Sequence, residues 1–208
     1  MTSGTDTYQR ILQQAETMFL RYGLKSVSMD DISQQLGISK KTLYHHFEDK
    51  EMLVTEVVKS VLQTNESLME ADIVNSQNAI HEEFLAITLM STLFQTMNPF
   101  ILFDLQKYYP KGFEVFVKHK QECIAEKVRS NLKRGIEEGL YRPEINIPIL
   151  LNLRQESLMM PFKPDFQSGL SSNLVEIATE ISIFFLNGIV TPKGKKWMDK
   201  YQTQKTKF

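Results

Sequence analysis

Apolar side chains recur every three or four positions along most of the chain, which is the spacing of one face of an α-helix. No segment shows the strict alternation of apolar and polar residues that predicts a half-buried β-strand. The pattern therefore predicts an all-α fold. In the first helical segment, residues 8–22, a single apolar stripe is formed by Ile11, Leu12, Ala15, Met18, Phe19 and Tyr22.

Two short helices are predicted between residues 28 and 47. Ser28 and Ser39 are good N-caps, because a hydroxyl accepts a hydrogen bond from the free N–H groups of a first helical turn. Gly37 stands where a left-handed residue ends the first of these helices. A helix, a short turn and a second helix form the arrangement of a helix-turn-helix unit.

Longer helices are predicted in the rest of the chain. One begins after Asp49 and runs through Leu62, and a polar stretch over residues 65–78 follows it. Because the pattern changes near Lys50, we expect two domains, residues 1–50 and 51–208. The basic tail from Lys193 is expected to be a frayed end. Further helices are predicted over residues 79–97, 100–109, 116–140, 148–160 and 170–188.

The segment over residues 170–188 is apolar nearly all round. Such a helix must be buried on nearly every side, either inside a core or between subunits. We favour a subunit interface, which predicts a homodimer. The candidate interface residues are Leu174, Ile177, Ala178, Ile181 and Phe185.

The charge distribution indicates local rather than general attraction to nucleic acid. The formal net charge is −1, whereas a protein that binds nucleic acid through bulk electrostatics is usually strongly basic. Residues 38–47 contain Lys40, Lys41, His45 and His46 without a carboxylate, and acidic residues flank them. A positive ridge between acidic shoulders is typical of one helix that enters a DNA groove.

Residues 40–47 carry the side chains that a DNA-reading helix needs, a polar face for bases and phosphates and an apolar face for packing. Leu43 and Phe47 form the apolar face. Lys50, at a helix N-terminus, combines a cation with free N–H groups and is a natural phosphate clamp. The candidate DNA-binding residues are Ser28, Lys40, Lys41, Thr42, Tyr44, His45, His46 and Lys50.

The segment from Ser28 to Leu53, SMDDISQQLGISKKTLYHHFEDKEML, resembles the DNA-binding signature of the tetracycline-repressor (TetR/AcrR) family. The resemblance covers residues 6–55. It implies an N-terminal three-helix DNA-binding domain with its reading pair at about residues 28–47, followed by a helical-bundle domain for ligand binding and dimerisation. It also implies a transcriptional regulator, usually a repressor, that reads a near-palindromic operator as a dimer and is released by a ligand. By resemblance, Thr42, Tyr44, His46 and Lys50 fall at positions that touch the DNA.

Aromatic and methionine side chains are abundant after residue 80. Such side chains can line a pocket for a small apolar or amphipathic effector, although at helical spacing they more often form plain core. The candidate ligand-binding residues are Phe84, Phe94, Met97, Phe100, Phe103, Phe116 and Met159.

Motifs for catalysis, cofactors or metals are not found. The sequence contains neither a glycine-rich phosphate loop nor a Gly-x-Ser-x-Gly elbow, and the segment starting at His81 fails the His-Glu-x-x-His zinc pattern. We therefore expect no enzyme, no cofactor and no metal. The alternative function is a helical module that binds small molecules or proteins and has lost specific DNA binding.

The cellular location is expected to be the cytoplasm. The chain has one cysteine, Cys123, and no charged-then-apolar leader. Its longest apolar run, residues 181–190, is far below the ~20 residues that span a bilayer. We therefore expect no association with a membrane.

Overall fold

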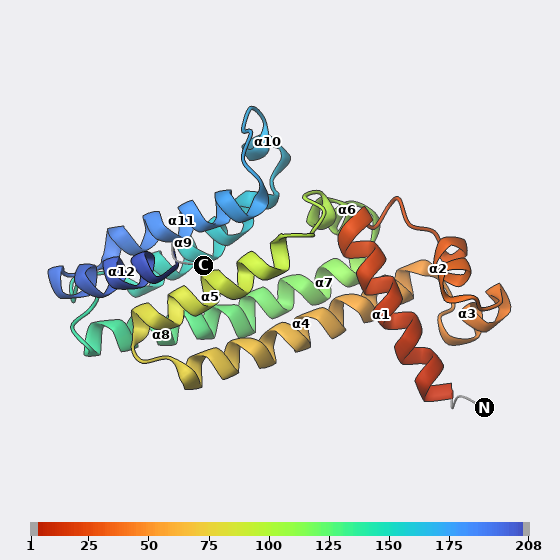
Figure 1. Cartoon of the computed structure of the whole chain (residues 1–208), viewed down its shortest axis with the longest axis horizontal. Coiled ribbons are helices and arrows are strands. Elements are labelled where there is room, and N and C mark those ends of the chain that lie inside the picture. Colours follow the sequence, from red (N-terminus) through yellow and green to blue (C-terminus); the bar gives the residue numbers. More distant parts are fainter. Residues whose placement is uncertain (1–3, 206–208) are drawn as a thin grey trace. The chain divides into compact units, whose positions relative to one another are not determined.

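The computed structural model describes residues 4–205, which form helices joined by loops (Figure 1). These residues form no strand, apart from an isolated antiparallel bridge between Tyr141 and Val190. The prediction of an all-α fold is confirmed. No helix in the described range is long and apolar enough to cross a membrane.

The chain divides into two compact units. Unit 1 comprises the residues up to Asn65 together with residues 96–119, and unit 2 comprises residues 66–95 together with those from Lys120 onward. This differs from the predicted boundary at residue 50, because residues 96–119 pack with the N-terminal helices. The Asn98 N–H donates a hydrogen bond of 2.7 Å to the Leu20 carbonyl, a long-range contact that no local pattern reveals.

Unit 1 has a hydrophobic core made of side chains from its N-terminal helices. The most buried side chains come from four different helices, and burying each one stabilises the fold by about 1.5–3 kcal/mol. They include Ile11, Phe19, Ile32, Leu43, Phe47 and Leu53, all 0% exposed. The helices of this unit are α1 (Gly4–Tyr22), α2 (Met29–Leu36), α3 (Lys40–His46), the first part of α4 (Lys50–Asn75), α6 (Ile101–Tyr108) and α7 (Pro110–His119).

Helix α4 is longer than predicted. The polar stretch that follows Leu62 does not interrupt it, and the helix continues to Asn75. Residues 65–75 contain neither glycine nor proline, so nothing in the backbone breaks the helix there. Polarity alone was therefore a poor signal for a helix end.

Unit 2 has one hydrophobic core, to which α5, α8, α11 and α12 all contribute. The helix predicted over residues 116–140 is interrupted, because a π-helical turn, η1 (Lys120–Ile124), separates α7 from α8. The other elements of this unit are α5 (Ala79–Phe94), α8 (Ala125–Glu137), α9 (Ile147–Met159), η2 (Met160–Phe162), α10 (Pro164–Gln167), α11 (Leu174–Ile189) and α12 (Pro192–Lys205).

The tail expected to fray is helix α12 over most of its length. Met198 is 0% exposed and belongs to the unit 2 core together with Tyr201. The Tyr201 hydroxyl accepts a hydrogen bond of 3.1 Å from the Asn78 side-chain amide. The spacing from Met198 to Tyr201 places both on one helical face, and this short apolar stripe among lysines was overlooked in the sequence.

Candidate nucleic-acid interface

Local hydrogen bonds define both helices of the predicted reading pair. The Ser28 hydroxyl accepts from the Asp31 N–H, while the Asp31 carboxylate accepts from the Ser28 N–H, which is a complete capping box at the start of α2. Gly37 ends this helix in the left-handed region, with φ of 65°. The Ser39 hydroxyl then accepts from the Thr42 N–H at 3.0 Å. Both predicted N-caps are confirmed.

Helix α3 is anchored through its apolar side. Leu43 and Phe47 are both fully buried. The ring of Tyr8, from α1, stacks on Phe47 at a centroid distance of 4.9 Å and also meets the edge of His46 at 6.3 Å. This anchorage leaves the opposite side of α3 free to face a partner, and it makes His46 a packing residue as well as a candidate contact.

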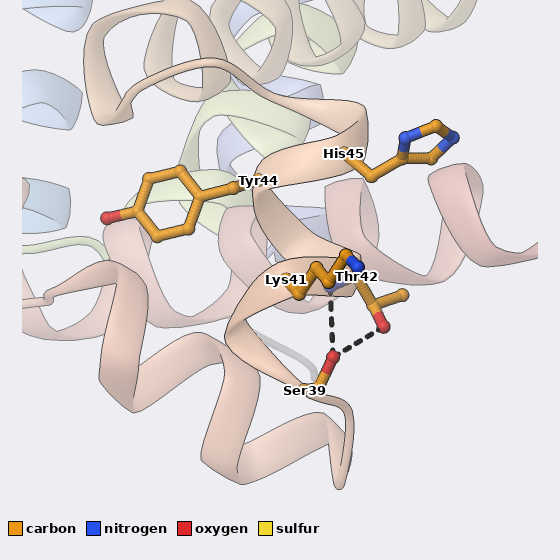
Figure 2. A pocket seen from close by; sticks show the side chains of 5 residues that line it. All are labelled: Ser39, Lys41, Thr42, Tyr44 and His45. Atoms are coloured by element: carbon orange, nitrogen blue, oxygen red, sulfur yellow. Dashed lines mark hydrogen bonds between the residues drawn. The ribbon is translucent and has the colours of Figure 1, made fainter.

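The free side of α3 presents polar side chains. Lys41, Tyr44 and His45 are exposed and Thr42 is half-buried. Figure 2 shows Tyr44 and His45 projecting from α3 in different directions, with Ser39 hydrogen-bonded to Thr42. A surface hollow of about 580 Å³ is lined by these four residues and Ser39. The set combines a cation, hydroxyl groups and an imidazole, which suit phosphates and base edges.

Lys40 has a partner within the protein. Its ammonium lies 2.6 Å from the Asp30 carboxylate in an ion pair whose side chains are 65% and 59% exposed. The hydrogen bond to Asp30 raises the pKa of Lys40 above its usual range. An exposed pair of this kind contributes little stability and exchanges readily. A contact between Lys40 and DNA therefore requires the exchange of Asp30 for a phosphate or a base.

Lys50 and Ser28 are both engaged within the protein, although Lys50 is half-buried and Ser28 is exposed. The Lys50 ammonium donates a 2.5 Å hydrogen bond to the Leu24 carbonyl, and burial lowers the pKa of this lysine. The Ser28 hydroxyl is engaged with the Asp31 carboxylate at 2.6 Å. Of the predicted DNA-binding residues, the structure thus gathers Lys41, Thr42, Tyr44 and His45 on one exposed surface.

Sequence reasoning missed Asp30 and Tyr8 as parts of this region. Asp30 is one of the acidic residues that flank the positive ridge, yet it also holds Lys40, ten positions away. Tyr8 was assigned to the apolar segment of the first helix without a role beside the reading helix. Neither pairing follows a helical period, so no local signal identifies it.

The candidate ligand-binding residues are divided between the two units. Phe84 is buried in the unit 2 core, and Phe94 meets the edge of Phe162 at 4.9 Å. Met159 belongs to the same unit. Phe100 and Phe103 are 48% and 40% exposed in unit 1, which also holds Met97 and Phe116. The structure therefore does not gather the set within one unit.

The candidate interface residues of α11 mostly face inward. Leu174, Ile177, Ala178 and Phe185 are at most 8% exposed within the single chain, and Ile181 is half-buried. These side chains pack in the chain's own interior and have little surface left for a partner. The exposed apolar residue of this helix is Phe184, at 83%. The face of α11 that the sequence analysis expects at a subunit interface therefore packs in the core of the chain itself.

Comparisons with known proteins agree with this architecture. Residues 11–57 match the family described as "Bacterial regulatory proteins, tetR family". The chain is 22% identical over 200 residues to the HTH-type transcriptional repressor KstR2 of Mycolicibacterium smegmatis. The aligned region covers 89% of this chain and 92% of that protein.

Solved structures extend the similarity to the whole fold. A TetR-family regulator from Agrobacterium tumefaciens has a TM-score of 0.75 at 20% identity and covers 91% of this chain and 100% of that chain. A regulator from Saccharomonospora viridis, in complex with choline, has a TM-score of 0.72 at 15% identity and covers 90% and 99% of the two chains. At these identities the likeness shows a shared fold.

The second helix of a helix-turn-helix pair is here anchored on one side and presents a polar face on the other. This is the arrangement of a DNA-binding protein. The chain belongs to the TetR family of bacterial transcriptional regulators. The family match spans most of α1, all of α2 and α3 and the start of α4, where the caps and the anchored reading helix lie. Because members of this family are transcription factors, the protein is a regulator and not an enzyme.

Proposed function

We propose that the protein is a dimeric repressor that reads a near-palindromic operator in the bacterial cytoplasm and is released by a small molecule. The observation that carries this proposal is the construction of α3. Leu43 and Phe47 are fully buried on one side, while Lys41, Tyr44 and His45 are exposed on the other. A rigidly held polar face is the requirement for entering a major groove.

The sign of regulation and the effector are inferred from relatives. The Mycolicibacterium smegmatis relative is named a repressor, and the Saccharomonospora viridis regulator is in complex with choline. We propose repression here, with release by an apolar or amphipathic effector that binds the helical body. Phe84, Phe94 and Met159 are the candidate contacts in unit 2.

A second copy of the chain is proposed to cover the exposed apolar side chains of α9 and α11. These two helices pack on each other within unit 2. Ile149 and Leu153 lie one helical turn apart on α9 and are 64% and 54% exposed, and Phe184 on α11 is 83% exposed. Exposed apolar side chains on two helices that pack on each other suit an interface in a twofold dimer.

Light scattering tests the dimer. At micromolar concentration we expect twice the chain mass of 24.1 kDa. The Phe184→Asp variant should shift the mass towards the monomer because it places a charge in an apolar interface. The Val74→Asp variant is the control, since Val74 is an exposed apolar residue of unit 2 outside α9 and α11. A wild-type mass equal to one chain would remove the dimer from the proposal.

Selection from a random DNA library tests the reading function. The wild type should enrich a near-palindrome, and the Lys41→Ala/Tyr44→Ala double variant should not. The Lys133→Ala variant removes an exposed lysine of α8 in unit 2 and should select the same sequence as the wild type. If the wild type enriches no sequence while remaining a dimer, the alternative of a helical binding module without specific DNA recognition is supported instead.

A further inference from the structure

Lys50 occupies a half-buried site in unit 1. Its ammonium donates to the Leu24 carbonyl at 2.5 Å and lies over the rings of Phe19 and Tyr109, 5.8 and 5.4 Å from their centroids. The Tyr109 hydroxyl donates to the same carbonyl at 3.4 Å. A carbonyl and two aromatic faces satisfy a cation through hydrogen bonding and cation–π attraction. The charge is thus already partnered within the protein.

The loop between α1 and α2 also contacts α6 and the residues that precede α6. The Lys25 N–H donates to the Asp104 carboxylate at 3.1 Å. Gly23 has φ of 88°, and a Cβ atom there would come within 3.2 Å of the Asn98 amide nitrogen. This loop leads directly to Ser28, the N-cap of α2. Its position therefore determines where the reading pair begins.

We infer that Lys50 is a positioning residue and not a phosphate ligand. Its ammonium ties the N-terminus of α4 to the loop between α1 and α2 and to Tyr109, and so sets the orientation from which Lys41 and Tyr44 reach DNA. This inference rests on the proposed DNA-reading function. It assigns Tyr109, 85 residues from Leu24 in sequence, to the support of the reading pair.

The two roles of Lys50 differ in their response to salt. A lysine that contacts a phosphate displaces a bound counterion, and each such contact contributes about 0.9 to the slope of log affinity against log salt concentration. A lysine that acts inside the protein displaces none. Its removal lowers affinity for the operator without changing the slope. Nonspecific binding, which depends on charge and not on exact placement, should also be retained.

The experiment uses the full chain and the operator obtained by selection. Affinities of the wild type, Lys50→Met, Tyr109→Phe and Lys41→Met are measured over a range of salt concentrations, for the operator and for unrelated DNA. We expect Lys50→Met to weaken operator binding by about tenfold or more, with the wild-type slope and wild-type nonspecific affinity. Tyr109→Phe should also weaken operator binding, by about threefold, without changing the slope. Lys41→Met should reduce the slope by about 0.9.

Several outcomes would overturn the inference. A slope reduced by Lys50→Met as much as by Lys41→Met would make Lys50 a phosphate ligand. Unchanged operator affinity in both Lys50→Met and Tyr109→Phe would show that the contact positions nothing. If Lys50→Met fails to fold, Tyr109→Phe decides the result. A wild type that binds no operator would overturn the proposed function and the inference together, whereas the other outcomes affect the inference alone.

Discussion

One ion pair in each unit shows two different uses of charge. In unit 1, the Lys40–Asp30 pair beside the reading helix is more than half exposed on both sides. In unit 2, Arg154 of α9 and Glu83 of α5 form a pair at 2.9 Å whose side chains are 4% and 11% exposed. Arg154 also donates to Ser182 of α11 at 3.1 Å, so that one guanidinium joins three helices.

This difference separates charges that are available to a partner from charges that hold the fold. An exposed pair is solvated whether or not it forms, so it exchanges its partner at little cost. A buried pair has lost its water, and each member depends on the other. The Lys40–Asp30 pair can therefore give way to a contact with DNA, while the Arg154–Glu83 pair specifies how the helices of unit 2 pack.

The largest expected effect is the loss of the buried pair. Arg154→Met should lower the free energy of unfolding by about 3–5 kcal/mol, because Glu83 is left buried without a countercharge. Denaturation in urea measures this change. The matched control is Arg129→Met, which breaks an ion pair with Glu126 whose side chains are 39% and 62% exposed. The control should cost less than about 1 kcal/mol.

A companion variant sharpens this test. Arg154→Met/Glu83→Leu removes both charges and should recover most of the lost stability, since no ion is then buried alone. If the double variant is as unstable as Arg154→Met, the packing of the arginine stem and not its charge is what stabilises unit 2.

The next effect concerns Cys123, the single thiol of unit 2. Burial and, after it, the hydrogen bond to Glu66 raise the pKa of Cys123 to about 11. Alkylation at pH 7.5 should therefore be about a hundredfold slower than for a free cysteine, because the thiolate is the reactive form. Glu66→Gln should speed the reaction, and wild-type labelling at the rate of a free thiol would contradict the assignment.

The same group gives a pH dependence with a definite sign. Because the folded-state pKa is raised, the contribution of the thiol to stability is present below the unfolded value of about 8.5 and is lost as pH rises through about 11. Cys123→Ser should reduce the loss of stability over this range. Thermal unfolding between pH 8 and 11 measures the difference between the two proteins.

A smaller effect is expected at the start of the reading helix. Ser39→Ala should lower stability by about 1 kcal/mol, because the Thr42 N–H loses its acceptor. Ser130→Ala, at an exposed position inside α8, is the control and should be close to neutral. Equal stability of the two variants in urea would show that this cap is replaced by water.

The smallest effect is expected for the exposed pair in unit 1. Lys40→Met should leave the free energy of unfolding close to the wild-type value, since both side chains are solvated with or without the pair. A loss as large as that of Arg154→Met would break the comparison between the units. Urea denaturation of the two variants under the same conditions provides this test.

The local features of the DNA-reading region could be read from the sequence because their interactions lie within one helical turn. Ser28 and Asp31 are three residues apart, as are Ser39 and Thr42. The apolar stripe of α1 and the apolar side of α3 repeat with the helical period. Helix type, caps, the anchored side and the family resemblance therefore follow from short stretches of chain.

Only the tertiary structure decided which distant groups meet. Lys50 and Leu24 are 26 residues apart, and Arg154 and Glu83 are 71 apart. A helical period shows which side of a helix is apolar but not which element covers it. For this reason, the place of residues 96–119, the inward face of α11 and the burial of Met198 in α12 depended on packing. The sequence determined the reading helix, and long-range contacts determined what holds it in position.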